Sequence, residues 1–182
     1  SSPRGLVVPI VRDADQLSAA IDHRRAAEAL AQALQHRYPD ADVRCVDVLA
    51  YASGTFHQFY AMSYLLLVRY CSWVWRISYA LLDRPVVYRM VQPLRRRWNL
   101  WIARRFVAML RQRPPDVTVA THFLPADVCS DGRKRGWLPT PLVVVITDFY
   151  PHRFWTTTDA DAVVAGTEQS AELLAPIRCG GR

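Results

Sequence analysis

The sequence has almost no lysine and no pattern that would hold a metal. Lys134 is the only lysine, so arginine carries nearly all of the basic charge behind the net +7. The four cysteines form no C-x-x-C pair, and none has a histidine at zinc-ligand spacing. We therefore expect no metal site, no cofactor, and free thiols in a reducing cytosol rather than structural disulfides.

A membrane-crossing run and a secretory leader are also missing. The most apolar stretch, residues 56–82, is interrupted by Arg69 and Arg76, each of which would cost about 2.5–3.5 kcal/mol at a bilayer centre. We expect two shorter helices there, partly buried or at an interface. No leader pattern is found at the start, and the first residue is Ser1 rather than methionine. We expect a fragment or processed product that is cytoplasmic and peripheral to the membrane.

Acidic residues are absent from positions 84–113, which hold nine arginines. Apolar side chains such as Leu94, Trp98 and Trp101 recur there at helical spacing, while Arg97 and Arg104 fall on another face. The pattern predicts one amphipathic helix with a basic face, ended by Pro114. Such a face is solvated in most proteins, but it also suits an anionic membrane surface. Nucleic-acid binding is not expected, because no RNP or zinc-finger motif accompanies the charge.

The order of the predicted elements indicates an α/β fold. Strands are predicted at 6–11, 41–49, 116–120, 142–146 and 160–165. Helices are predicted after Asp22 to about residue 38, from a first turn at Pro125 towards residue 135, and after Thr167 with 170–174 as the body. Strands that alternate with helices favour a Rossmann-like parallel sheet flanked by helices on both faces. Pro9 would confine the first strand to a sheet edge or place it at a strand end. The apolar run 142–146 predicts a central strand buried on both faces, and Thr167 is a candidate helix N-cap.

Polar clusters follow three of the predicted strands. They lie around His23, at Thr121 and His122, and at Thr147 to His152. In an open parallel sheet, ligands bind outside the carboxyl ends of the strands. Each cluster also has an ordinary explanation: His23 could be a surface histidine, His122 a hydrogen-bonded structural residue, and Asp148 a cap of the segment that follows.

Four segments carry a resemblance to a known family. They are HRRAAEAL at 23–30, VDVLAY at 46–51, PDV with THF between 115 and 123, and VITDF with His152 and Trp155 between 145 and 155. In this order they resemble the amino-terminal domain of the monogalactosyldiacylglycerol synthase and processive diacylglycerol glucosyltransferase family. The resemblance implies the acceptor-side half of a two-domain GT-B glycosyltransferase, with the aromatic, arginine-rich segment as a helical insertion.

The same resemblance assigns roles to partners and domains. Residues 1–182 would be a single acceptor-side domain that takes a diacylglycerol-type lipid and touches an anionic membrane surface. A nucleotide-sugar donor such as a UDP-hexose would bind a carboxy-terminal domain that is absent from the chain. We therefore expect a hexosyltransferase domain that is inactive in isolation.

The resemblance also assigns site residues. His23 matches the family histidine proposed as general base on the acceptor hydroxyl, a role that suits imidazole near neutral pH. Asp148 would share the catalytic site, and the substrate-binding residues would be His122, His152 and Trp155. Membrane-binding residues are expected in the aromatic and basic segment: Trp73, Trp75, Arg95, Arg96, Arg97, Trp98 and Trp101.

One departure from the family pattern leaves a second interpretation of the function open. Where the family has glycines before the histidine, this chain has Ser18 to Asp22. Side chains there would obstruct the close approach of backbone to substrate. The alternative is a non-catalytic membrane-surface binding module derived from such an enzyme.

Overall fold

A five-stranded, wholly parallel sheet forms the centre of the protein. The computed structural model describes residues 5–10, 18–51, 70, 73–74, 77, 81, 84–148, 151, 154–155 and 159–179. The strands are β1 (Gly5–Ile10), β2 (Asp42–Asp47), β3 (Val117–Ala120), β4 (Leu142–Ile146) and β5 (Ala162–Ala165). Their order across the sheet is β2-β1-β3-β4-β5, and every pairing is parallel. The predicted α/β, Rossmann-like fold is confirmed.

β1 is not the edge strand that Pro9 allowed. It lies between β2 and β3, and β2 and β5 form the two edges. The other possibility holds, because Pro9 is the last residue but one of β1. The pairing of β1 with β3 covers only Leu6 and Val7, so the missing N–H of proline falls beyond that ladder.

One face of the sheet is covered by α1 (Ser18–Arg37). Ala27 of α1 is fully buried, and it packs in a cluster with Leu30, Ala31 and valines from β2, β3 and β4. Small alanine side chains allow α1 to lie close to the sheet. The helix begins at Ser18, five residues before the predicted start after Asp22. Residues 18–22, where the family has a glycine loop, are therefore helical.

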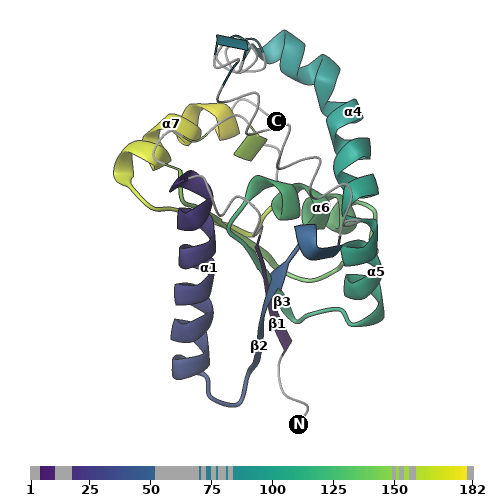
Figure 1. The fold of residues 1–182 in the computed structure, drawn as a ribbon, viewed down its shortest axis with the longest axis vertical. Helices are drawn as coiled ribbons and strands as arrows, with labels where there is room; N and C mark the ends of the chain where they lie inside the picture. Colours follow the sequence, from purple (N-terminus) through teal and green to yellow (C-terminus); the bar gives the residue numbers. More distant parts are fainter. Residues whose placement is uncertain are drawn as a thin grey trace.

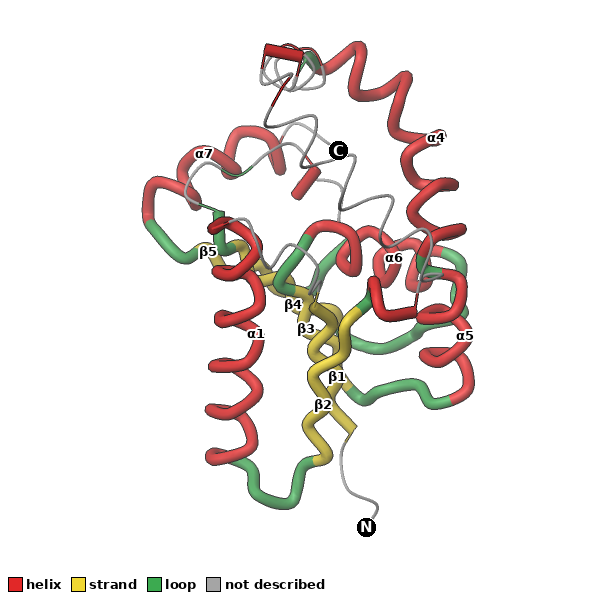
Figure 2. Tube along the Cα trace, in the orientation of Figure 1, coloured by secondary structure: helices red, strands yellow, loops and turns green. Residues whose placement is uncertain are grey.

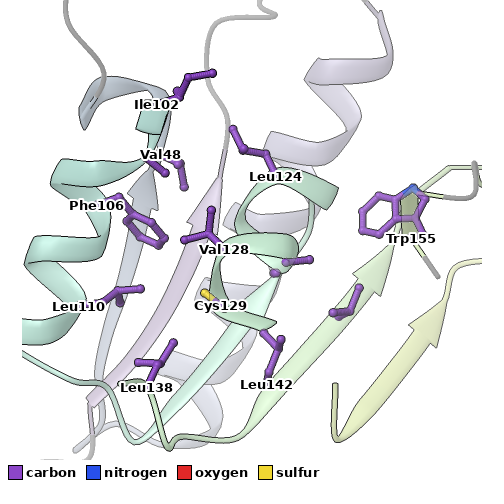
Figure 3. Close-up of a cluster of buried hydrophobic side chains, with 14 of the residues drawn as sticks. Val48, Ile102, Phe106, Leu110, Leu124, Val128, Cys129, Leu138, Leu142 and Trp155 are labelled. Atoms are coloured by element: carbon purple, nitrogen blue, oxygen red, sulfur yellow. The ribbon is translucent and has the colours of Figure 1, made fainter. Parts of the chain in front are cut away.

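The opposite face is covered by α5 (Arg104–Gln112) and α6 (Phe123–Lys134). Figure 2 shows α1 and α7 (Glu168–Cys179) on one side of the sheet and α5 and α6 on the other. Phe106 and Leu110 of α5, and Val128 and Cys129 of α6, meet Leu142 and other side chains of the sheet in the main core (Figure 3). Strand β4 alternates between fully and partly buried residues. The expectation of full burial on both faces is therefore only half met, since the α1 side covers β4 less completely.

The basic segment 84–113 is two helices rather than one. α4 spans Pro85–Ile102, and the chain breaks helical geometry at Ala103 before α5 begins. Pro93 lies inside α4, and Ala103 has ψ of 11°. The first turns of α4 rise beyond the carboxyl edge of the sheet, while its last turns contact α6 (Figure 1).

Most of the segment 56–82 lies outside the described residues, so the two helices predicted there stay a prediction. Tyr70, Trp73, Ile77 and Leu81 are helical and exposed. Among the helices that the structure describes, none combines the length and the apolar character needed to cross a bilayer.

The predicted cap at Thr167 is confirmed, and a glycine that the sequence analysis did not single out ends another helix. The Thr167 hydroxyl accepts a hydrogen bond from the backbone N–H of Ser170 at 3.1 Å and so caps α7. At the end of α6, Gly136 adopts a φ of 73°. Only glycine enters this left-handed region without strain, so the position ends the helix cleanly.

Candidate functional site

The carboxyl ends of β3 and β4 bring two of the three predicted polar clusters together. The strands are hydrogen-bonded neighbours, with Ala120 opposite Val144. Thr121 and His122 directly follow β3, and Thr147 and Asp148 directly follow β4. The pairs therefore lie side by side at the edge where ligands of open parallel sheets bind.

Trp155 joins the two clusters. Its indole Nε1 donates a hydrogen bond to Oδ2 of Asp148 at 2.6 Å. The same ring meets His122 edge-on, with ring centroids 6.5 Å apart. Trp155 is only 2% exposed, so its surface is used for packing and its N–H is used by Asp148. Trp155 therefore positions Asp148, and its predicted contact with a substrate stays a prediction.

Asp148 is held from a second side by α7. The hydroxyl of Ser170 donates a hydrogen bond to the backbone carbonyl of Asp148 at 2.8 Å. The Ser170 side chain also lies 2.7 Å from the Thr167 hydroxyl that caps α7. The position of Asp148 is thus determined by an indole and by a helix N-terminus. Sequence analysis missed Ser170, whose only signal was its place at the third position after a threonine cap.

His122 is the N-cap of α6. Its Nδ1 accepts a hydrogen bond from the backbone N–H of Leu124 at 3.2 Å. The ring also stacks on Phe123, with centroids 4.1 Å apart. The structural role considered for His122 is therefore present, and the substrate role stays a proposal.

His23 lies in the second turn of α1. Because β1 and β2 are parallel, the connecting helix α1 runs back along the sheet and begins at its carboxyl edge (Figure 1). The backbone of His23 is therefore at the same edge as Asp148. The side chain of His23 and the whole of His152 lie outside the described residues, so the hollow predicted between His23 and Asp148 stays a prediction.

The predicted membrane-binding arginines of α4 divide between two faces. Arg95 pairs with Asp127 of α6 at 2.7 Å, is 13% exposed at its side chain, and lies over the Phe154 ring at 4.1 Å. Arg96 pairs with the buried Asp131. Both arginine side chains therefore reach towards α6. The next residue lies about 100° farther round the helix. Arg97 alone of the three is exposed, and membrane binding by these arginines stays a prediction.

The other face of α4 carries exposed apolar side chains. We call it the α4 outer face, and its members follow at intervals of four and three: Val86, Met90, Leu94, Trp98 and Trp101. Met90 is 75% exposed, and the two tryptophans are about half exposed, with ring centroids 5.2 Å apart. Arg104 lies over the Trp101 ring at 5.7 Å. Trp73 is exposed as well, and Trp75 lies outside the described residues.

Buried acids on α6 make this division possible. Asp127 also accepts a hydrogen bond from the Asn99 side chain at 3.1 Å, and Asp131 takes a second partner in Arg135. Sequence analysis missed Asn99, Asp127 and Asp131. The signal was present, since a segment with nine arginines and no acid must find its counter-ions elsewhere, and Asp127 and Asp131 share one helix face at i and i+4.

A hollow of about 420 Å³ lies along β2 and the end of α5, from Gly5 at the start of β1 to Tyr51 just beyond the end of β2. Its polar rim includes Asp42, Arg44 and Arg113, and Tyr51 and Met109 line its apolar part. Asp42 and Arg44 form an ion pair. None of the residues predicted for the site lines this hollow.

Potential metal ligands and cysteine thiols are the remaining reactive groups in the described part of the chain. Those residues contain no group of three or more His, Cys, Asp or Glu side chains arranged to hold a metal ion. Neither Cys45 nor Cys129 forms a disulfide among the described residues. Burial raises the pKa of the Cys129 thiol to about 12, so it stays protonated and unreactive at neutral pH.

Comparison with known proteins identifies the family. The family described as Monogalactosyldiacylglycerol (MGDG) synthase matches residues 23–176. That range contains the strand ends that carry His122 and Asp148, both faces of α4, and Trp155. Neither the curated proteins nor the solved structures yielded a match. The matched range is most of the chain, and the chain therefore belongs to the monogalactosyldiacylglycerol synthase family, whose members are glycosyltransferases of glycolipid synthesis.

Proposed function

We propose that the protein is the acceptor-side domain of a hexosyltransferase that passes a sugar from a nucleotide-sugar to a diacylglycerol-type lipid. The observation that carries the proposal is the joining of Asp148 and His122 through Trp155 at the carboxyl edge of the sheet. In an open α/β sheet this edge is where ligands bind. Family membership supplies the class of reaction.

In this proposal His23 takes the proton of the acceptor hydroxyl as the bond to the sugar forms. An imidazole can do this because it titrates near neutral pH. Asp148 orients the base or the hydroxyl, and its own position is fixed by Trp155 and Ser170. His152 would contact the acceptor from the same side. The nucleotide-sugar would bind a second domain outside these residues, across a shared cleft.

The α4 outer face would dock on an anionic bilayer, which makes the protein peripheral to the membrane. Exposed tryptophans favour the interface between lipid and water. Exposed arginines beside them contribute about 1 kcal/mol each near an anionic surface. Because α4 rises beyond the carboxyl edge of the sheet (Figure 1), docking through it would bring the membrane to the same end of the molecule as the candidate site.

A transfer assay tests the catalytic proposal. The chain is fused to a donor domain of the same family, and sugar transfer from a UDP-hexose to diacylglycerol in vesicles is measured. His23→Ala is expected to lower the rate by about 10²–10⁴-fold, the usual contribution of a general base. His36→Ala, a change at the far end of α1, is the matched control and should leave the rate unaltered. Equal rates for wild type and His23→Ala would show that His23 is not the base.

A second candidate function rests on the start of α1. Helical residues 18–22 stand where the family has a glycine loop, and side chains there would keep a substrate from the backbone. On this alternative the protein is a non-catalytic membrane-surface module. It predicts salt-sensitive vesicle binding and no transfer by any fusion, whereas transfer by the wild-type fusion would exclude it.

A further inference from the structure

The hollow along β2 has an apolar wall that the main core holds in place. Because side chains alternate along a strand, Asp42, Arg44 and Val46 face the same side of the sheet. Val46 packs there against the core, and the Tyr51 ring meets the fully buried Phe106 ring edge-on, with centroids 6.2 Å apart. The volume of about 420 Å³ falls within the range of about 300–1,000 Å³ that small-molecule sites occupy.

The rim of the hollow has a cation that no described anion neutralises. Asp42 and Arg44 form an ion pair, in which Nε of Arg44 donates a hydrogen bond to Oδ1 of Asp42 at 3.0 Å. The pKa of Asp42 is lowered chiefly by this hydrogen bond from Arg44, and the charge of Arg113 adds to the lowering. Arg113 therefore lies at the same rim, where it is exposed and has no ion-pair partner within the described part of the chain.

We propose that the hollow binds a single-chain carboxylate of the fatty-acid type, with the acid group on Arg113 and the chain against Tyr51 and Met109. A guanidinium can donate two parallel hydrogen bonds to a carboxylate. The unbranched, flexible side chain of Met109 can adapt to an alkyl chain.

The charge of the ligand follows from the charge of the rim. A carboxylate carries one negative charge, which matches the single cation that is left over. A phosphate monoester carries about −1.5 to −2 near neutral pH, and it would leave negative charge beside Asp42. Diacylglycerol carries no charge at all. The hollow is therefore separate from the proposed acceptor site, and the inference does not rest on the proposed function.

NMR of the chain with ¹³C-labelled methionine methyl groups tests the inference, with decanoate as the probe. The Met109 signal is assigned by its loss in Met109→Leu. Met90 on the α4 outer face is an internal control, because binding of the alkyl chain to that face would shift its signal. We expect decanoate to shift Met109 saturably and to leave Met90 in place. The uncharged 1-decanol should bind about tenfold more weakly, because it lacks the hydrogen bonds to a charged group.

Two arginines at the end of α5 separate recognition by the rim from general attraction to positive charge. Arg113→Gln removes the cation at the rim and should weaken decanoate binding about tenfold. Arg111→Gln is the matched control, because Arg111 lies over the Trp137 ring at 4.9 Å and does not line the hollow. It should leave the affinity for decanoate unchanged. Both arginines are exposed, so both variants should fold, and thermal unfolding checks this.

Equal affinity for decanoate and 1-decanol, or unchanged decanoate binding by Arg113→Gln, would overturn the inference. A shift of Met90 without a shift of Met109 would place decanoate on the α4 outer face and overturn it as well. Displacement of decanoate by UDP would assign the hollow to a nucleotide instead. None of these outcomes bears on sugar transfer to diacylglycerol, which the fusion assay measures separately.

Discussion

Asp148 shows how much of the candidate site depends on single side chains. One of its carboxylate oxygens accepts a hydrogen bond from the indole N–H of Trp155, and its backbone carbonyl accepts one from the hydroxyl of Ser170. The sequence could place Asp148 at the end of a strand, because the run 142–146 is unmistakable. It could not show that Trp155, seven residues later, folds back behind it, since that depends on how the intervening segment packs.

Replacement of Trp155 by phenylalanine tests this support. The change keeps an aromatic ring in the core but removes the N–H bonded to Asp148. We expect the free energy of unfolding to fall by about 1–3 kcal/mol, because a hydrogen bond to a carboxylate is lost and the site is half-buried. Denaturant unfolding measures the loss, and the transfer rate of the fusion protein should fall as Asp148 is released.

Trp137→Phe is the matched control for this change. Trp137 packs against α6 under Arg111, with no bond to the candidate site. It should cost some stability and leave the transfer rate per folded molecule unchanged. A Trp155→Phe protein that retained full activity would show that the indole N–H does not position Asp148.

The stability of the fold depends on pH through Asp161. The backbone N–H of Leu142 donates to its carboxylate at 2.7 Å, and Arg133 also bonds it. The first of these contacts is the main cause that lowers the pKa of Asp161 from 3.8 in the folded state. A lowered folded pKa stabilises the protein above the unfolded value, and this contribution is lost as pH falls through the folded pKa.

Asp161→Asn should therefore reduce stability at pH 7 and reduce it less at pH 2, because acid protonates the carboxyl of the wild type and removes the contribution of its charge. Urea unfolding of wild type and variant at the two pH values measures the difference. An equal loss of stability at the two pH values would mean that the charge on Asp161 contributes nothing. Only the hydrogen bonds of the Asp161 side chain would then stabilise the fold.

At the scale of elements, α4 is a helix with two apolar faces. Its inward face holds Tyr88, Asn99 and Ile102, and its outward face holds Leu94, Trp98 and Trp101. Helical periodicity alone could not separate the inward face from the outward face, because Trp98, Trp101 and Ile102 all fit one apolar stripe. Only the acids of α6 decide which arginines turn inward. The break at Ala103 had no sequence signal that separates it from the helix on either side.

Two arginines of α4 should therefore behave differently. Arg97→Gln removes an exposed charge and should weaken binding to anionic vesicles about fivefold, since one arginine contributes about 1 kcal/mol there, with unfolding unaffected. Arg95→Met leaves Asp127 buried without its cation and should cost about 3–5 kcal/mol of stability. Vesicle sedimentation and denaturant unfolding measure the two effects.

The paired variant Arg95→Met with Asp127→Leu should recover most of that stability, because no unpaired charge is left buried. Trp98→Ser on the α4 outer face should weaken vesicle binding, whereas the control Tyr38→Ser, which removes an exposed aromatic residue just beyond the far end of α1, should not. If Arg95→Met weakened vesicle binding while leaving stability intact, the division of α4 into two faces would be wrong.

For the whole molecule, the sequence sufficed for the architecture. The five strands, their parallel pairing and the placement of polar residues at the carboxyl edge follow from apolar runs, helix caps and the right-handed connection rule. The candidate site was harder to predict from the sequence, because its residues come from β3, β4, α6, α7 and the segments beside them and meet only in the folded chain. The aromatic segment before α4 and the side chain of His23 keep the status of predictions.

The whole-molecule claim is that the lipid acceptor binds at the carboxyl edge, on the side from which α4 rises. The hollow beside Tyr51 and Met109 is the physical alternative, since it lies along the edge strand β2 and contains none of the predicted site residues. The two sites differ in the peptides that line them. A bound lipid that can be cross-linked will therefore mark one or the other.

Photo-cross-linking of the chain with a diazirine-bearing diacylglycerol in anionic vesicles, followed by mass spectrometry of the peptides, makes the decision. The account predicts labels in the first turns of α1 and in the segments that follow β3 and β4, near His122 and Asp148. Labels concentrated at Tyr51, Met109 and the start of β2 would contradict it.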